Sequence, residues 1–240
     1  MHVIIYNLFG ALFTVAVALA LGLLLLRRLS LPLFRIEERL FGFLVGSACL
    51  SMIVFALATI KIAQGSVFFL LGSLIIGYAL FKKVHRPKGN EFPPLPRTWT
   101  WLFGVVFAAF TVLYFVNAMA PEMSSDGMSY HLGEVAKYYR AHGFVRITTN
   151  VYANLPQGIE LLFLHGYPYG GHSTAAMIHF AFLLCLALLM LSYGRRIGYP
   201  ACGVAGALFT YTSPIVGQVG TVAYVDVGLA SIAFAIFYLL

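Results

Sequence analysis

The feature that most constrains this chain is a series of long apolar runs separated by short polar segments. Of its 240 residues, 61% are hydrophobic and only 10% are charged, whereas a soluble domain is about 25% charged. A fold this apolar would have no polar shell in water, which excludes a soluble enzyme, a disordered tail and a disulfide scaffold. Because a helix needs about 20 apolar residues to cross a bilayer, the sequence predicts seven spans, near residues 3–26, 40–60, 65–81, 98–119, 172–193, 199–218 and 224–240.

Positively charged residues gather in three of the segments between these runs. Eleven of the 15 Lys and Arg residues lie there: Arg27, Arg28, Arg35 and Arg39, then Lys82, Lys83, Arg86, Lys88 and Arg97, and finally Arg195 and Arg196. Cytoplasmic loops carry an excess of Lys and Arg, and one alternation of the seven runs places all three segments in the cytoplasm. The net charge of +7 is therefore ascribed to membrane topology, and no nucleic-acid partner is expected.

These patterns predict an all-α fold, a polytopic membrane helical bundle of about seven transmembrane helices. The basic, proline-rich segment 82–97 divides it into a three-span region, residues 1–97, and a second region, residues 98–240. In the first region, Gly42 and Gly46 form a small-xxx-small pair, which is typical of closely packed helices.

The same alternation places the long segment 120–171 on the outer side of the membrane, and loops this long are usually functional. Within it, residues 130–142 have helical periodicity, with apolar side chains at Leu132, Val135, Ala136 and Tyr139. This pattern predicts an amphipathic juxtamembrane helix, which either lies on the membrane surface or packs with one solvated face. Residues 159–164 are too few to span and are predicted to be re-entrant or interfacial, with a turn at 167–171.

Acidic residues concentrate on the predicted outer side, which holds five of the eight: Glu122, Asp126, Glu134, Glu160 and Asp226. Asp126 precedes the predicted helix, where Asp is common as a turn or N-terminal residue. A carboxylate at the membrane–water boundary is also suited to act as a general base. Asp226 lies at the outer end of the last run, where it is either a helix cap or a functional acid.

Four segments together resemble a known family: Asp126-x-x-x-Tyr130-His131-Leu132, the helix that follows it, Asn154-x-Pro156 and Ala223-Tyr224-Val225-Asp226. They are similar to bacterial members of the GT-C superfamily, integral membrane glycosyltransferases related to the protein O-mannosyltransferases and the lipid A aminoarabinose transferases. The resemblance covers roughly residues 98–240 and identifies this region as a GT-C-like membrane module. Such proteins usually continue through several more helices, so the chain is expected to be an N-terminal fragment truncated at its C-terminus.

The resemblance implies inverting transfer of a sugar from a polyprenyl-phosphate donor to a hydroxyl of a lipid, glycan or protein acceptor. The reaction would take place on the extracytoplasmic side of the bacterial inner membrane, in contact with membrane lipid. Asp126 would be the general base and His131 a second catalytic residue. Residues expected to bind substrate are Tyr130, Glu134, Lys137, Arg140, Arg146 and Asn154. Some members of the family use a divalent metal, Mg²⁺ or Mn²⁺, which Asp126 and Asp226 would hold here, and others use none.

Two other functional classes stay open. A polytopic transporter would place charged residues at mid-membrane, facing a pathway, whereas the predicted spans hold almost no charge in their interiors. A noncatalytic membrane assembly subunit would depend on its apolar faces and would tolerate the loss of Asp126.

Overall fold

The computed structural model describes residues 2–86 and 89–240, so the predicted loop residues Pro87 and Lys88 lie outside the described part of the chain. The described residues form ten α-helices and no strands, which confirms the all-α prediction. The α-helices are α1 (His2–Leu29), α2 (Arg35–Thr59), α3 (Gly65–Phe81), α4 (Arg97–Met119), α5 (Leu132–Arg140), α6 (Glu160–Gly170), α7 (His172–Arg196), α8 (Pro200–Tyr211), α9 (Pro214–Gly220) and α10 (Asp226–Leu239). A π-helical turn, η1 (Gly127–His131), and a 3-10 turn, η2 (Val151–Asn154), complete the set.

Four of these helices, α1, α2, α4 and α7, are long and apolar enough to cross a membrane, which indicates a multi-pass membrane protein. The prediction of seven spans is therefore wrong, because three of the seven runs do not form helices of this length. Two of them form apolar helices of only 17 residues (α3) and 14 residues (α10). The third, 199–218, is divided into α8 and α9 at Ser213, because the residue before a proline is disfavoured in the helical conformation and Pro214 follows.

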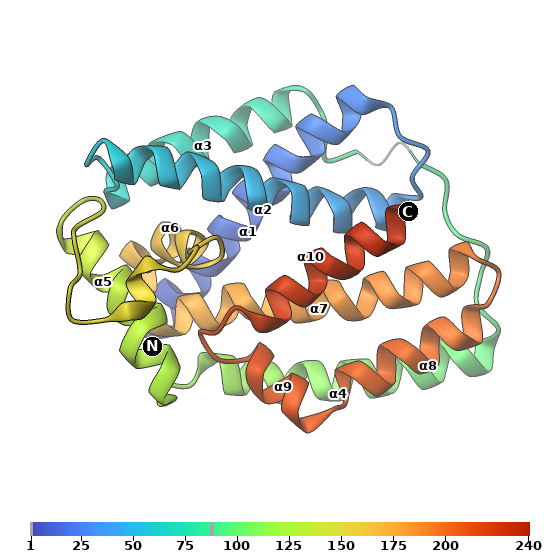
Figure 1. The fold of residues 1–240 in the computed structure, drawn as a ribbon. Coiled ribbons are helices and arrows are strands. Elements are labelled where there is room, and N and C mark those ends of the chain that lie inside the picture. The colour runs from blue at the N-terminus through green and yellow to red at the C-terminus, as the bar shows by residue number, and fades with distance from the viewer. Residues whose placement is uncertain (1, 87–88) are drawn as a thin grey trace.

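The longer helices run roughly along one direction, so most connecting segments collect at two ends (Figure 1). We call the end with residues 27–39, 82–86, 89–97 and 195–200 the basic end, and the end with residues 120–159 and 221–226 the loop end. At the basic end, the three predicted basic segments are joined by hydrogen bonds. Arg27 donates to the carbonyl oxygen of Lys83, Arg195 donates to that of Pro93, and Arg196 binds the Glu37 carboxylate.

Helices α1 and α2 cross so closely that small residues are required at the contact. A Cβ atom added to Gly46 would overlap the backbone of Ala18, and one added to Gly22 would overlap the backbone of Gly42. The predicted packing role of the Gly42–Gly46 pair is therefore confirmed. Helix α7 lies at the centre of the bundle and buries residues along most of its length.

The structure decides between the two alternatives predicted for α5 and corrects the turn predicted at 167–171. The apolar face of α5 is buried in the core, with Leu132 and Val135 each 1% exposed, so α5 is a packing helix with a solvated face. Helix α6 extends through the expected turn at 167–171 and ends at Gly170, with Pro168 inside it. It contacts α1, α2 and α7, so residues 159–164 lie inside the bundle.

Candidate functional site

The buried carboxylate of Glu122 connects two segments of the loop end that lie about a hundred residues apart in the chain. Its Oε1 accepts hydrogen bonds from the backbone N and the Oγ of Ser124, at 2.9 and 2.5 Å. Its Oε2 accepts one from the backbone N of Ala223, at 2.7 Å. One side chain therefore holds the segment that leads to Asp126 against the segment that leads to Asp226.

Gly127 makes this arrangement possible. A Cβ atom at position 127 would lie 2.8 Å from the carboxyl carbon of Glu122, so the folded-back carboxylate leaves no room for a side chain. The chain then forms the π-helical turn η1, in which Tyr130 and His131 lie. Turns of this kind are rare and are frequent at functional sites, which makes η1 a good marker for the candidate site.

Asp126 is exposed at the start of η1 and interacts with Tyr130. Partial burial, the charge of the Asp126 carboxylate and a hydrogen bond between the two side chains raise the pKa of Tyr130 to about 12. Tyr130 therefore stays a neutral phenol that donates to Asp126. Its ring also stacks on Tyr152, with 4.3 Å between the ring centroids, which ties η1 to η2.

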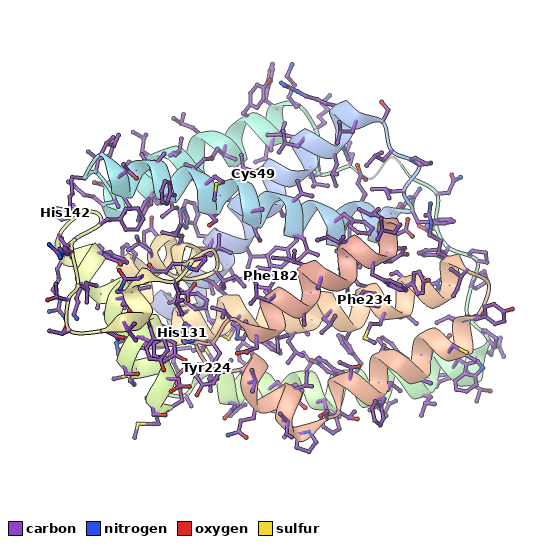
Figure 2. All side chains as sticks on the ribbon, in the orientation of Figure 1. Cys49, His131, His142, Phe182, Tyr224 and Phe234 are labelled. Atoms are coloured by element: carbon purple, nitrogen blue, oxygen red, sulfur yellow. The ribbon has the colours of Figure 1, made fainter. Side chains whose placement is uncertain are left out.

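His131 is buried between the two motif segments. Its Nδ1 lies 2.9 Å from Oε1 of Glu160, the first residue of α6. Its ring centroid lies 5.6 Å from that of Tyr224, and Figure 2 shows the two labels close together at the loop end. The structure thus brings His131 of the first segment to Tyr224 of the second.

Glu134 lies on the buried side of α5, where it is 3% exposed. Its Oε2 accepts a hydrogen bond from Nε2 of Gln157, and its Oε1 is a buried atom without a hydrogen-bond partner. Burial and then the nearby Glu160 carboxylate raise the pKa of Glu134, while His131 and Lys137 act in the opposite direction. Gln157 also lies 3.4 Å from the hydroxyl of Tyr138.

His179, a buried residue of α7, anchors the segment that carries Asp226. Its Nδ1 lies 2.9 Å from the carbonyl oxygen of Val222, so Nδ1 must be the donor. Its Nε2 lies 3.2 Å from the backbone N of Gly228, so Nε2 must be the acceptor. Both contacts together require the neutral ring with its proton on Nδ1. Asp226 itself is exposed at the first position of α10, near enough to His179 for their charges to interact.

The four remaining predicted residues lie farther along the loop. Lys137 and Arg140 are exposed on the solvated side of α5. Arg146 and Asn154 line one pocket of about 470 Å³, together with Thr148. A hydrogen bond links this pocket to η1, since the side-chain Nδ2 of Asn150 lies 3.5 Å from the backbone carbonyl oxygen of Ser129.

The donor set for a metal is incomplete at this site. Asp126 and Asp226 are both exposed, and the described residues contain no group of three or more His, Cys, Asp or Glu side chains placed to hold an ion. A divalent cation bound only by side chains is therefore not supported by the residues present, and the chemistry derived below uses none.

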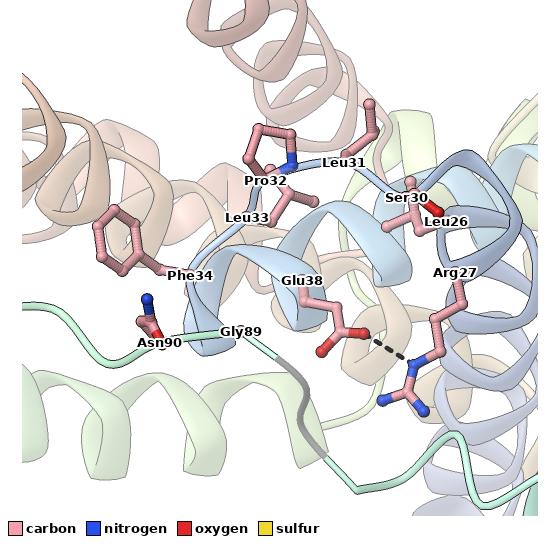
Figure 3. Close-up of a pocket in the computed structure, with 10 residues that line it drawn as sticks. All are labelled: Leu26, Arg27, Ser30, Leu31, Pro32, Leu33, Phe34, Glu38, Gly89 and Asn90. Carbon is pink, nitrogen blue, oxygen red and sulfur yellow. Dashed lines mark hydrogen bonds and ion pairs between the residues drawn. The ribbon is translucent and has the colours of Figure 1, made fainter.

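A second pocket, of about 440 Å³, lies at the opposite, basic end and is drawn in Figure 3. It is lined by residues that include Ser30, Phe34 and Asn90. The Nε of Arg27 lies 2.8 Å from Oε1 of Glu38 at its edge, and the same guanidinium binds two backbone carbonyls of the 82–86 segment. The Arg27 guanidinium already binds acceptors of the protein, so it is not available to bind an anion in this pocket.

Sequence reasoning missed the residues that hold the site together: Glu122, Gln157, Glu160 and His179. Their partners are backbone groups or residues distant in the chain, which spacing does not reveal. Glu122 and Glu160 gave a weak signal as members of the acidic group on the predicted outer side. His179 also gave one, because a lone imidazole in an apolar run needs hydrogen-bond partners once it is buried.

No protein-family model, curated protein or solved structure matches this chain. Any assignment of function therefore rests on the residues and their geometry.

Proposed function

We propose that this chain is a membrane glycosyltransferase module that moves a sugar from a polyprenyl-phosphate donor to an acceptor hydroxyl at the loop end. The observation that carries the proposal is the meeting of the two motif segments. Glu122 binds the backbone of Ala223, and His131 lies beside Tyr224. Segments that resemble one family's site residues are thereby assembled at one end of a membrane bundle.

The chemistry assigned to this end is a single displacement. The acceptor hydroxyl oxygen attacks the anomeric carbon, and its proton passes to the Asp126 carboxylate. The bond between the anomeric carbon and the phosphate oxygen breaks, and polyprenyl phosphate leaves with the bonding electron pair, so the anomeric configuration inverts. Asp126 is suited to this role because it is exposed and lies beside the neutral phenol of Tyr130, with which it interacts.

The surroundings of the loop end suit a lipid-linked donor. Helix α4 presents an apolar surface along most of its length, with Val112 and Val116 about two-thirds exposed. It ends at Met119, only a few residues before Asp126. A polyprenyl tail would therefore lie in the lipid phase beside α4, while its phosphosugar reaches Asp126.

The test is a transfer assay in membranes with a labelled polyprenyl-phosphate sugar. Wild type should transfer the label, and Asp126→Asn at equal expression should lose transfer by about 100-fold or more, since a general base contributes about 10²–10⁴-fold. Glu91→Gln is the matched control, because Glu91 is an exposed acid at the basic end and its loss should leave transfer unchanged. Full activity in Asp126→Asn would remove the proposed base.

We further propose that the loop end faces the extracytoplasmic side of a bacterial inner membrane, because the basic end gathers the Lys and Arg residues that mark cytoplasmic loops. In a Cys202→Ser background, Ser125→Cys should react with a membrane-impermeant thiol reagent added outside intact cells. Ser30→Cys, at the basic end, should react only after the membrane is opened. The reverse pattern would contradict the proposed sidedness.

One observation favours a transporter as the second candidate. His165 of α6 is buried inside the bundle and lies 2.9 Å from Oγ1 of Thr14 in α1, and ionisable groups inside membranes often mark ion paths. The cavity beside His165 is, however, otherwise lined by apolar residues such as Val17 and Leu50, which offer no polar path. Uptake into sealed vesicles that is lost in His165→Phe, with no sugar transfer, would favour the transporter.

A further inference from the structure

We propose that Glu160 is the positioning residue of His131, and that the protonated His131 ring donates a hydrogen bond from its Nε2–H to the phosphate of the departing lipid. This inference rests on the proposed function for the identity of the phosphate. It adds to that function a pair formed by His131 and Glu160, and Glu160 lies in no motif of the sequence.

Glu160 and His131 are in direct contact. Nδ1 of His131 lies 2.9 Å from Oε1 of Glu160, and both side chains are largely buried, at 7% and 12% exposure. An ionised carboxylate only accepts hydrogen bonds. Beside an ionised Glu160, Nδ1 is therefore the donor in this contact, and Nε2 is the ring nitrogen that remains to meet a ligand.

The Nε2 atom of His131 is the ring nitrogen that does not contact Glu160. In the part of the chain that the structure describes, Nδ1 has its partner in Glu160, while no hydrogen bond is formed by Nε2. The ring lies against Tyr224 of the second motif segment, and Tyr130 precedes it in η1. The nitrogen left without a partner thus belongs to a ring that lies between the Asp126 segment and the Asp226 segment.

The cations of the loop lie at different distances from Asp126 along the chain. Lys137 and Arg140 follow Asp126 by 11 and 14 positions, which places them about 16 and 21 Å farther along a helix that rises 1.5 Å per residue. His131 follows Asp126 by five positions, at the end of the π-helical turn η1. The phosphate leaves the carbon that the acceptor hydroxyl attacks beside Asp126, and of these three cations His131 is the nearest to Asp126 along the chain.

The His131 ring has charged and aromatic neighbours on several elements. Glu160 from α6 binds it directly, Glu134 from α5 interacts with both His131 and Glu160, and His179 from α7, a neutral ring, is also near His131. Tyr130 and Tyr224 supply the two aromatic contacts. Glu160 is the acid in hydrogen-bond contact with Nδ1, so it is the group that determines how the ring is oriented.

The experiment uses nitrogen NMR on the full chain in lipid bilayers, with the histidine rings labelled with ¹⁵N. The His131 signals are identified as those absent from His131→Asn. In wild type, the neutral ring should carry its proton on Nδ1, the nitrogen in contact with Glu160. Glu160→Leu should move the proton of the neutral ring to Nε2, whereas Glu134→Gln, the matched control, should leave it on Nδ1. Unchanged signals from the other six histidines confirm that each variant is folded.

The phosphate is tested in the same sample by adding polyprenyl phosphate or, as the control, uncharged polyprenol. Polyprenyl phosphate should shift the Nε2 signal of wild type, polyprenol should not, and inorganic phosphate tests whether the lipid tail is needed. The inference would be overturned if the neutral wild-type ring carried its proton on Nε2. It would also be overturned if polyprenyl phosphate left the Nε2 chemical shift unchanged. Neither readout needs turnover, so a failed transfer assay with a positive NMR result would reject the proposed function and leave the His131–Glu160 pair standing.

Discussion

Oε2 of Glu122 and the backbone N of Ala223 lie 2.7 Å apart and form a buried hydrogen bond across a separation of 101 residues. Backbone amides buried without a partner are costly, and Ala223 is fully buried. The carboxylate of Glu122 thus gives the buried N–H of Ala223 its acceptor, and it holds the two motif segments together. The candidate site depends on this contact more than on any contact between the motif residues themselves.

Replacing Glu122 by alanine should therefore lower the free energy of unfolding by about 2–4 kcal/mol, because hydrogen bonds to a charged group contribute about 1.5–3 kcal/mol each and a buried amide loses its partner. Reversible unfolding in mixed micelles measures this change. Glu91→Ala removes an exposed acid and should change stability by less than about 1 kcal/mol. Equal effects of the two variants would show that the Glu122 contact does not bind the segments together.

The raised pKa of Glu134 gives a prediction about pH. Burial and Glu160 favour the protonated form of Glu134 in the folded state. Between the ordinary pKa of a glutamate and this raised value, the folded state binds more protons than the unfolded state, so the free energy of unfolding falls as the pH rises.

Glu134→Gln keeps the acceptor for Gln157 but cannot ionise, so this part of the pH dependence should disappear. The measurement is the difference between the unfolding free energies of wild type and variant, followed upward from about pH 4.5. The variant should gain stability relative to wild type as the pH rises. A difference that stays constant, or that changes in the opposite direction, would contradict the burial of an ionisable Glu134.

The basic end contains a buried carboxylate that links three elements. Glu37 of α2 is 0% exposed, and it binds Nη1 of Arg196 at 2.7 Å and the hydroxyl of Tyr238 at 2.5 Å. Arg196→Met should destabilise the fold by about 3 kcal/mol, because it leaves a buried charge without its cation. Adding Glu37→Gln to that variant should recover part of the loss. Arg35→Met is the control, since the Arg35–Glu91 pair is exposed and should contribute less than about 1 kcal/mol.

The class of fold could be predicted because apolarity along the chain is a local property. The gathering of Arg27, Arg196 and their neighbours at one end likewise agrees with a charge pattern that can be counted. The number of long spans was wrong for two reasons. The runs at 65–81 and 224–240 form helices of only 17 and 14 residues, and apolarity alone did not reveal the break at Ser213, before Pro214.

The candidate site was only partly visible in the sequence for a different reason. Asp126, Tyr130 and His131 stand together in one short motif, and the structure keeps them together in η1 and at its start. Glu160 and His179 act through contacts with residues 29 and 43 positions away. Such contacts are set by how α6 and α7 pack, and periodicity within one helix does not indicate them.

The crossing of α1 and α2 gives the most sharply controlled prediction. A single methyl group added at Gly46 would overlap the backbone of Ala18, which is part of a packed helix and cannot move aside easily. Gly77 of α3 is also inside a helix but has no atom within 4 Å of an added Cβ. Gly77→Ala should therefore be neutral or stabilising by up to about 1 kcal/mol, since alanine favours the helix over glycine.

Gly46→Ala should instead cost about 1–3 kcal/mol, which is typical of overpacking a tight core. The two variants make the same chemical change, so the difference between their unfolding free energies in mixed micelles isolates the helix contact. The double substitution Gly46→Ala and Gly22→Ala should cost more than either change alone, because the added methyl groups at both positions press the same two helices apart. A Gly46→Ala variant as stable as Gly77→Ala would mean that α1 and α2 do not cross at these glycines.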